Sequence, residues 1–125
     1  MYKGKCLCGN VSFTVSGELT PPSACHCSQC RRQSGHYWSA SHIPTSKLKI
    51  EGEENITWFL ATQEARRGFC STCGSFLFWE SFKEDHTSVS MGAFETPTNT
   101  KIAKHIFVAN KGDYYEINDD LPQSD

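Results

Sequence analysis

Alternating apolar and polar positions mark the first predicted element. In the stretch KGKCLCGNVSFTVSG, apolar Val11, Phe13 and Val15 are separated by single residues that bear hydroxyl groups. A repeat of two residues is typical of a strand with one buried face. Because the letters CGN before it are turn-forming, the opening predicts a β-hairpin. The next segment, TPPSA, contains two prolines that cannot donate ladder hydrogen bonds, so a loop is expected there.

Six further apolar or alternating runs are each about as long as one strand. They are rich in aromatic and β-branched residues and are bounded by turn-forming or charged residues. The runs are HYWSASHI, LKIEG, ITWFLAT, SFLFWESF, TSVSMGAF and KHIFVAN. Helical signals are confined to PTSKL and to SQCRRQSG, where Ser28 is the expected N-cap and Gly35 the expected end. The pattern therefore predicts a mainly β protein with short helical turns.

Length and charge narrow the classes of protein to which the chain can belong. Its 125 residues fit a single domain over residues 1–125. The net charge of -2 provides no basic surplus for binding nucleic acid. No apolar run reaches the roughly 18 residues needed to span a bilayer, and MYKGKC lacks the apolar core of a signal peptide. We therefore expect a cytoplasmic protein without nucleic-acid or membrane partners, while its oligomeric state is not indicated.

The chain contains seven cysteines, a large number for its length. In a reducing compartment, clustered thiols bind metal more often than they form disulfides. The cysteines separate into two outlying pairs and one central group of three. This division into four and three predicts two metal sites.

The two outlying pairs have the spacing of a structural zinc site. Cys70 and Cys73 form a C-x-x-C pair followed by a glycine that permits a tight turn around a metal ion. Cys6 and Cys8 form a second pair in KCLCG. Four thiolates complete a tetrahedral shell, so we expect these four cysteines to share one zinc ion. The alternatives are a redox-active C-x-x-C pair and cysteines buried only as small apolar residues.

The central group lies in CHCSQCRR and has no fourth cysteine. Cys25, Cys27 and Cys30 can converge on a second zinc ion and leave one position for water or substrate, as in catalytic zinc sites. Arg31 and Arg32 could offset the charge of three thiolates or hold a substrate carboxylate. This group is therefore the candidate catalytic site.

Other residues leave alternatives open. A histidine could complete the shell of the central group and make that site structural. The nearest imidazoles belong to His26, His36 and His42. A solvated face is the favoured interpretation for the charged residues before the second pair, and an approach to the open zinc is the alternative. These residues are Glu64, Arg66 and Arg67. His105 is interpreted as either a proton carrier or a hydrogen-bonded structural residue.

The elements CLCG, CHCSQCRR and FCSTCG, in this order, resemble the glutathione-dependent formaldehyde-activating enzyme family, which includes the centromere protein V group. The similarity extends to GNVSFTVSG, SGHYWSA, RRGFCSTCGSFLFW, VSMGAF, HIFVANK and EINDDLPQ. The resemblance implies a zinc-stabilised β-tent fold of several small antiparallel sheets. It also implies a structural zinc at Cys6, Cys8, Cys70 and Cys73, and a second zinc at Cys25, Cys27 and Cys30.

The founding activity of that family is the condensation of formaldehyde with glutathione to S-hydroxymethylglutathione, which is classed with the carbon-sulfur lyases. The resemblance therefore implies a zinc-dependent lyase acting on a thiol or a thiol-aldehyde adduct, with glutathione as the expected small-molecule partner. Zinc could lower the pKa of the thiol or polarise the aldehyde oxygen. The alternative is a non-catalytic zinc-binding module for a protein or small-ligand partner.

Overall fold

Two β-sheets organise the computed structural model, which describes residues 1–125. A three-stranded antiparallel sheet has the order β1-β2-β5, and a seven-stranded sheet has the order β10-β3-β4-β9-β8-β7-β6. The strands are β1 (Tyr2–Lys5), β2 (Ser12–Val15), β3 (Ser23–Cys25), β4 (Trp38–Pro44), β5 (Leu48–Glu51), β6 (Ile56–Leu60), β7 (Ala65–Cys70), β8 (Phe76–Ser81), β9 (His86–Ser90) and β10 (Lys104–Ile106). The mainly β prediction is confirmed.

One short α-helix and four 3-10 turns connect the strands. They are α1 (Ser28–Ser34), η1 (Thr45–Lys47), η2 (Glu53–Asn55), η3 (Met91–Ala93) and η4 (Val108–Asn110). The helix predicted in SQCRRQSG is confirmed, and it ends at Gly35, whose left-handed φ of 82° suits glycine. The predicted N-cap is wrong, because Cys27 rather than Ser28 accepts the capping hydrogen bond from the Cys30 N–H. The turn predicted in PTSKL is η1, whereas the other three turns were not expected.

The strand pattern is confirmed for the opening hairpin and for the six later runs. Two strands were not predicted. β3 lies in the chain that follows the TPPSA prolines, where a loop was expected, and pairs with β4 on one side and β10 on the other. β7 is the segment ARRGFC, whose two arginines were interpreted as part of a solvated face. β10 runs parallel to β3, so the larger sheet is mixed rather than wholly antiparallel.

The hydrophobic core joins the two sheets. Val11, Phe13 and Val15, the alternating residues of the opening, are at most 2% exposed. The ring of Phe13 packs edge-on against Phe78 of β8, with the ring centroids 5.5 Å apart, and against Phe94 at 5.2 Å. A Cβ atom on Gly4 would lie 2.3 Å from the ring of Phe13, so only glycine permits this close packing.

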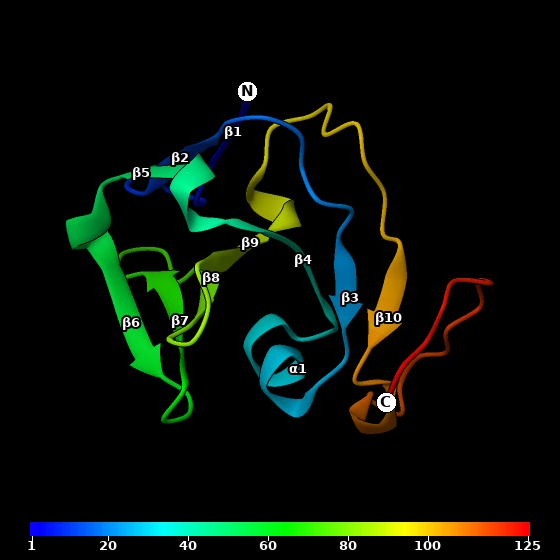
Figure 1. The fold of residues 1–125 in the computed structure, drawn as a ribbon. Helices are drawn as coiled ribbons and strands as arrows, with labels where there is room; N and C mark the ends of the chain where they lie inside the picture. The colour runs from blue at the N-terminus through cyan, green and yellow to red at the C-terminus, as the bar shows by residue number, and fades with distance from the viewer.

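The long strand β4 connects two parts of the larger sheet. Its first residues pair with β3 and its later residues pair with β9. Figure 1 shows β6 to β9 on one side of the molecule, β3 and β10 on the other, and α1 between the lower parts of the two sides. This arrangement places α1 opposite β7 and β8.

The helices of the chain are too short and too polar for any of them to span a membrane.

Candidate metal centre and its cavity

Four cysteines from two distant turns meet at one end of the core. Cys6 and Cys8 lie in the turn after β1, and Cys70 and Cys73 lie at the turn between β7 and β8. Sγ of Cys8 is 3.6 Å from that of Cys6 and 3.7 Å from that of Cys70, and all four sulfur atoms lie within 4.8 Å of one another. A tetrahedral zinc ion bound at about 2.3 Å separates its sulfur ligands by about 3.8 Å. The donor set and its spacing therefore fit a four-thiolate zinc site.

Hydrogen bonds from both turns support this cluster. The Val11 N–H donates to Sγ of Cys6 at 3.4 Å, and the Leu7 N–H donates to Oγ of Ser75 at 3.1 Å. The Ser75 hydroxyl, followed by the Ser75 backbone N–H, lowers the pKa of the Cys73 thiol to about 5. A thiolate ligand is therefore available at neutral pH, as metal binding requires.

The second cluster is built where β3 passes into α1. Cys25 ends β3, Cys27 caps α1, and Cys30 is buried in the first turn of that helix. The three sulfur atoms lie within 4.8 Å of one another. Hydrogen bonds from the Cys25 and Cys30 thiols, together with the Cys30 backbone N–H, lower the pKa of the Cys27 thiol. The three sulfurs could hold one metal ion with three thiolates, and the arrangement fits zinc.

None of the three nearest histidines turns toward this cluster. The ring nitrogens of His26 contact Tyr115 and His105, and those of His42 contact Ser88 and Glu84. His36 packs against the rings of neighbouring tyrosines. The structure therefore places no histidine as a fourth ligand beside these three cysteines.

An arginine from β7 reaches the three-cysteine cluster. Arg67 is only 5% exposed, and its Nη1 and Nη2 atoms lie 3.6 and 3.7 Å from Sγ of Cys30. Its Nε donates to Gln29 at 2.9 Å and its Nη1 donates to Gln33 at 3.0 Å, so α1 fixes the guanidinium. For Arg67 the solvated-face interpretation is wrong, and the alternative of an approach to the cluster is confirmed.

The neighbouring residue, Arg66, faces the other side of the sheet from Arg67. Arg66 donates to Glu80 at 2.8 Å, and its guanidinium lies 3.8 Å from the ring centre of Trp58. Successive residues of a strand face opposite sides of the sheet. As a strand, ARRGFC places its two arginines on opposite faces, and this alternation is the sequence signal for the position of Arg67.

Arg31 and Arg32 lie on α1 but do not line the cavity next to the three cysteines. Arg32 is exposed, whereas Arg31 is half-buried. Their predicted contact with substrate therefore stays a prediction, and Arg67 is the arginine that the fold places beside the thiols.

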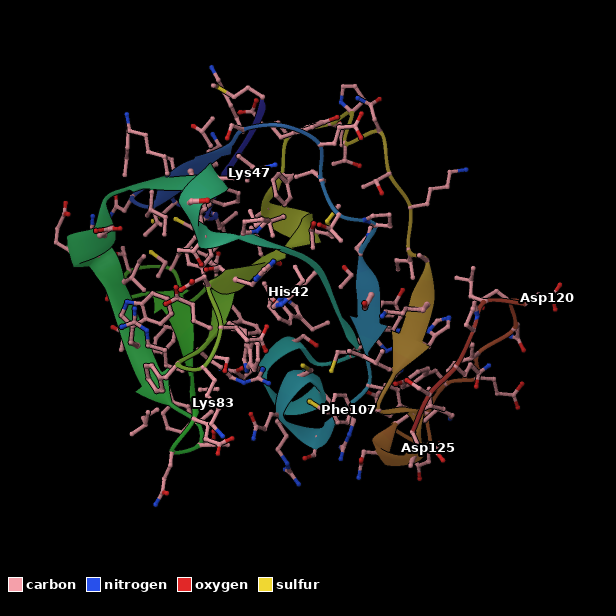
Figure 2. All side chains as sticks on the ribbon, in the orientation of Figure 1. His42, Lys47, Lys83, Phe107, Asp120 and Asp125 are labelled. Carbon is pink, nitrogen blue, oxygen red and sulfur yellow. The ribbon has the colours of Figure 1, made fainter.

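A cavity of about 850 Å³ lies against the three-cysteine cluster. Charged residues of both signs line it, and the Lys83 ammonium donates to the Glu64 carboxylate at 2.7 Å. Figure 2 shows three of the lining residues, His42, Lys83 and Phe107, around α1. The other lining residues used below are Cys25, Cys27, Cys30, Arg67, Glu84 and Lys104. The cavity could thus receive a small polar molecule at the thiols.

Behind the three cysteines, hydrogen bonds link two buried histidines to a tyrosine and a carboxylate of the C-terminal segment. His26 is fully buried, and its ring joins the Tyr115 hydroxyl at 2.5 Å and the ring of His105 at 2.9 Å. His105 in turn lies 3.0 Å from the Asp119 carboxylate, which holds the pKa of Asp119 below its usual value. Because a carboxylate only accepts, His105 donates to it, His26 donates to His105, and Tyr115 donates to His26. This chain of hydrogen bonds attaches the C-terminal segment to the loop between Cys25 and Cys27.

Replacing His105 with phenylalanine is expected to destabilise the protein and loosen its C-terminal segment. The variant keeps a ring of similar size but leaves the buried N–H of His26 without an acceptor, which costs about 1–3 kcal/mol. Urea unfolding of the metal-loaded protein measures the loss, and hydrogen exchange at residues 111–125 reports the loosening. The matched control is His36→Phe, because His36 is exposed. Equal stability of the two variants would contradict the structural role of His105.

Comparisons with known proteins find a family and two relatives. A family model described as glutathione-dependent formaldehyde-activating enzyme matches residues 1–110. A Schizosaccharomyces pombe protein named as an uncharacterized lyase is 30% identical over 82 residues, which cover 62% of this chain and only 56% of that protein. The crystal structure of a Rhodobacter sphaeroides protein is similar, with a TM-score of 0.64 and 28% identity, and the match covers 76% of this chain and 89% of that one.

Proposed function

Because the chain belongs to the glutathione-dependent formaldehyde-activating enzyme family, we propose that it is a zinc-dependent lyase that makes or breaks the carbon-sulfur bond of a thiol-aldehyde adduct. The observation that carries the proposal is the three-cysteine cluster, which lies against a cavity with charged residues in its lining and has a buried arginine beside it. The proposed cofactors are two zinc ions, one structural and one at the reactive site.

The reactive site consists of Cys25, Cys27 and Cys30, with Arg31 and Arg32 on the same helix as further proposed members. When bound by the three cysteines, zinc would supply a Lewis acid that lowers the pKa of a thiol or polarises an aldehyde oxygen. The Arg67 guanidinium would offset part of the negative charge that the three cysteines would carry as zinc-bound thiolates. Gln29 and Gln33 hold this guanidinium in place, so it needs no rearrangement when a substrate enters.

The reaction balances without any oxidant or reductant. In the direction of synthesis, the thiol sulfur bonds to the aldehyde carbon, the carbon-oxygen double bond becomes single, and the oxygen receives the proton that the thiol has released. In the direction of cleavage, the carbon-sulfur bond breaks, the carbon-oxygen double bond forms again, and the hydroxyl proton passes to the sulfur, so that the thiol and aldehyde are restored. In this reaction the site would orient the two reactants and stabilise the thiolate form of the thiol substrate.

Glutathione is the proposed thiol, and S-hydroxymethylglutathione the proposed adduct. The cavity carries the ammonium groups of Lys83 and Lys104 and the carboxylates of Glu64 and Glu84. Such a mixture suits a tripeptide that itself has carboxylates and an ammonium group. The same proposal assigns the protein to the cytoplasm, since clustered thiols stay reduced there.

Addition of the zinc-loaded protein is expected to speed exchange between formaldehyde hydrate and S-hydroxymethylglutathione. We expect at least about a tenfold increase over the spontaneous rate, which corresponds to roughly 1.4 kcal/mol of barrier. Exchange spectroscopy by NMR measures the rate at equilibrium, with Cys25→Ser as the variant that loses a proposed zinc ligand. An unchanged rate with the wild-type protein would contradict the proposed reaction. If glutathione also leaves the absorption of the cobalt-substituted protein unchanged, a non-catalytic zinc module becomes the better description.

A further inference from the structure

Two histidines and one carboxylate lie close together apart from the seven cysteines, and two of the three residues line the cavity. His42 belongs to β4, His86 begins β9, and Glu84 lies in the turn before β9. One ligand atom of each residue lies within 4.8 Å of those of the other two. The three side chains are half-buried or exposed, so an ion from solution could reach them.

Strand register explains why the two histidines meet. In the β4–β9 pair, His42 lies opposite Ser88, and His86 is two residues before Ser88 on the same strand. Residues two apart on a strand share a face, and diagonal neighbours on adjacent strands are within reach of long side chains. The two imidazole rings are stacked, with their centroids 4.9 Å apart and their planes 18° from parallel.

The contacts of His42 are those of a metal ligand held in orientation. Its Nδ1 lies 2.9 Å from the Ser88 hydroxyl, and its Nε2 lies 3.1 Å from Oε2 of Glu84. Histidines that bind metals commonly make a hydrogen bond through the other ring nitrogen. Two nitrogen or oxygen ligands at about 2.1 Å from a tetrahedral ion are separated by about 3.4 Å. The 3.1 Å separation in this structure is close to that value.

We propose that His42, Glu84 and His86 bind a divalent transition-metal ion, with Zn²⁺ as the favoured species. Two imidazoles and a carboxylate match the ligand preference of zinc. Three protein ligands leave one position of a tetrahedral ion for water or an anion. Because His42 and Glu84 also line the cavity, an anionic group of a molecule inside it can reach this ion. The inference rests on the geometry of these three side chains and not on the proposed lyase reaction.

The test uses the full chain with both cysteine clusters already loaded with zinc. Calorimetric titration with further Zn²⁺ is expected to show one additional equivalent that binds more weakly than the zinc at the cysteines. In His86→Ala that equivalent is lost. In Ser88→Ala, which removes only the hydroxyl next to His42 Nδ1, the affinity falls by about 10–100-fold. The control His36→Ala, at an exposed histidine outside the cluster, leaves the titration unchanged.

A second readout identifies the ligands. Titration of the same zinc-loaded protein with Co²⁺ is expected to give visible absorption without the intense thiolate-to-metal bands of cysteine coordination. His86→Gln serves as a milder substitution, and circular dichroism with the content of cysteine-bound zinc verifies that each variant is folded. The proposal is overturned if no additional equivalent binds, or if the equivalent binds with unchanged affinity in His42→Ala or in His86→Ala. In either case the lyase proposal is unaffected, because catalytic rate is not part of this measurement.

Discussion

Replacing Cys70 with serine is expected to abolish stable folding under conditions in which the wild-type protein is folded. Cys70 is fully buried, and its sulfur lies 3.7 Å from that of Cys8, which comes from the opening hairpin. Apparent zinc-binding free energies at structural sites are about 10–16 kcal/mol, as large as the roughly 5–15 kcal/mol that stabilises a whole domain. The loss of one ligand weakens a term that is comparable with the total stability, and it also replaces a fully buried sulfur with a hydroxyl.

Thermal unfolding followed by circular dichroism, together with metal analysis of the purified protein, measures this effect. The matched control is Cys25→Ser, which alters the three-cysteine cluster and leaves the four-cysteine cluster complete. Cys25→Ser is expected to lose zinc from its own cluster and to keep the fold. A Cys70→Ser protein that unfolds at the wild-type temperature would show that the four-cysteine site does not stabilise the fold.

Replacing Arg67 with methionine is expected to weaken zinc retention at the three-cysteine cluster and to remove the proposed activity. The substitution leaves the charge of the thiolates without its buried partner at 3.6 Å. Breaking a buried charge pair by removing one member costs about 3–5 kcal/mol, which is roughly two to four orders of magnitude in an equilibrium constant. Gln29 and Gln33 also lose the guanidinium that donates a hydrogen bond to each of them.

Arg66→Met is the matched control on the same strand. Arg66 faces the other side of the sheet, and its partly exposed pair with Glu80 is expected to contribute about 1 kcal/mol or less. Competition for zinc with a chromogenic chelator measures retention, and formaldehyde exchange measures activity. Arg67→Lys is expected to be intermediate, because an ammonium keeps the charge but not the planar fork of donors. If Arg66→Met and Arg67→Met lose zinc equally, Arg67 has no special role at the cluster.

Much of the fold follows from local pattern. The alternation of Val11, Phe13 and Val15 predicted a hairpin with one buried face, and all three side chains are buried. Gly35 ended the predicted helix because only glycine readily adopts a left-handed φ. The local pattern does not predict strand β7, because two adjacent arginines interrupt the alternation of apolar and polar residues. The segment is a strand because it pairs with β6 on one side and β8 on the other.

The sequence by itself determined the division of the cysteines, since spacings such as C-x-x-C act within a single turn and need no knowledge of distant residues. Only the tertiary structure decided which charged and titratable side chains lie beside the cysteines or beside one another. Arg67 reaches Cys30 because β7 lies opposite α1, and His42 meets His86 because of the register between β4 and β9. Such contacts depend on strand pairing and on the face to which each side chain points. A shift of one residue in register would send every one of these side chains to the opposite face of the sheet.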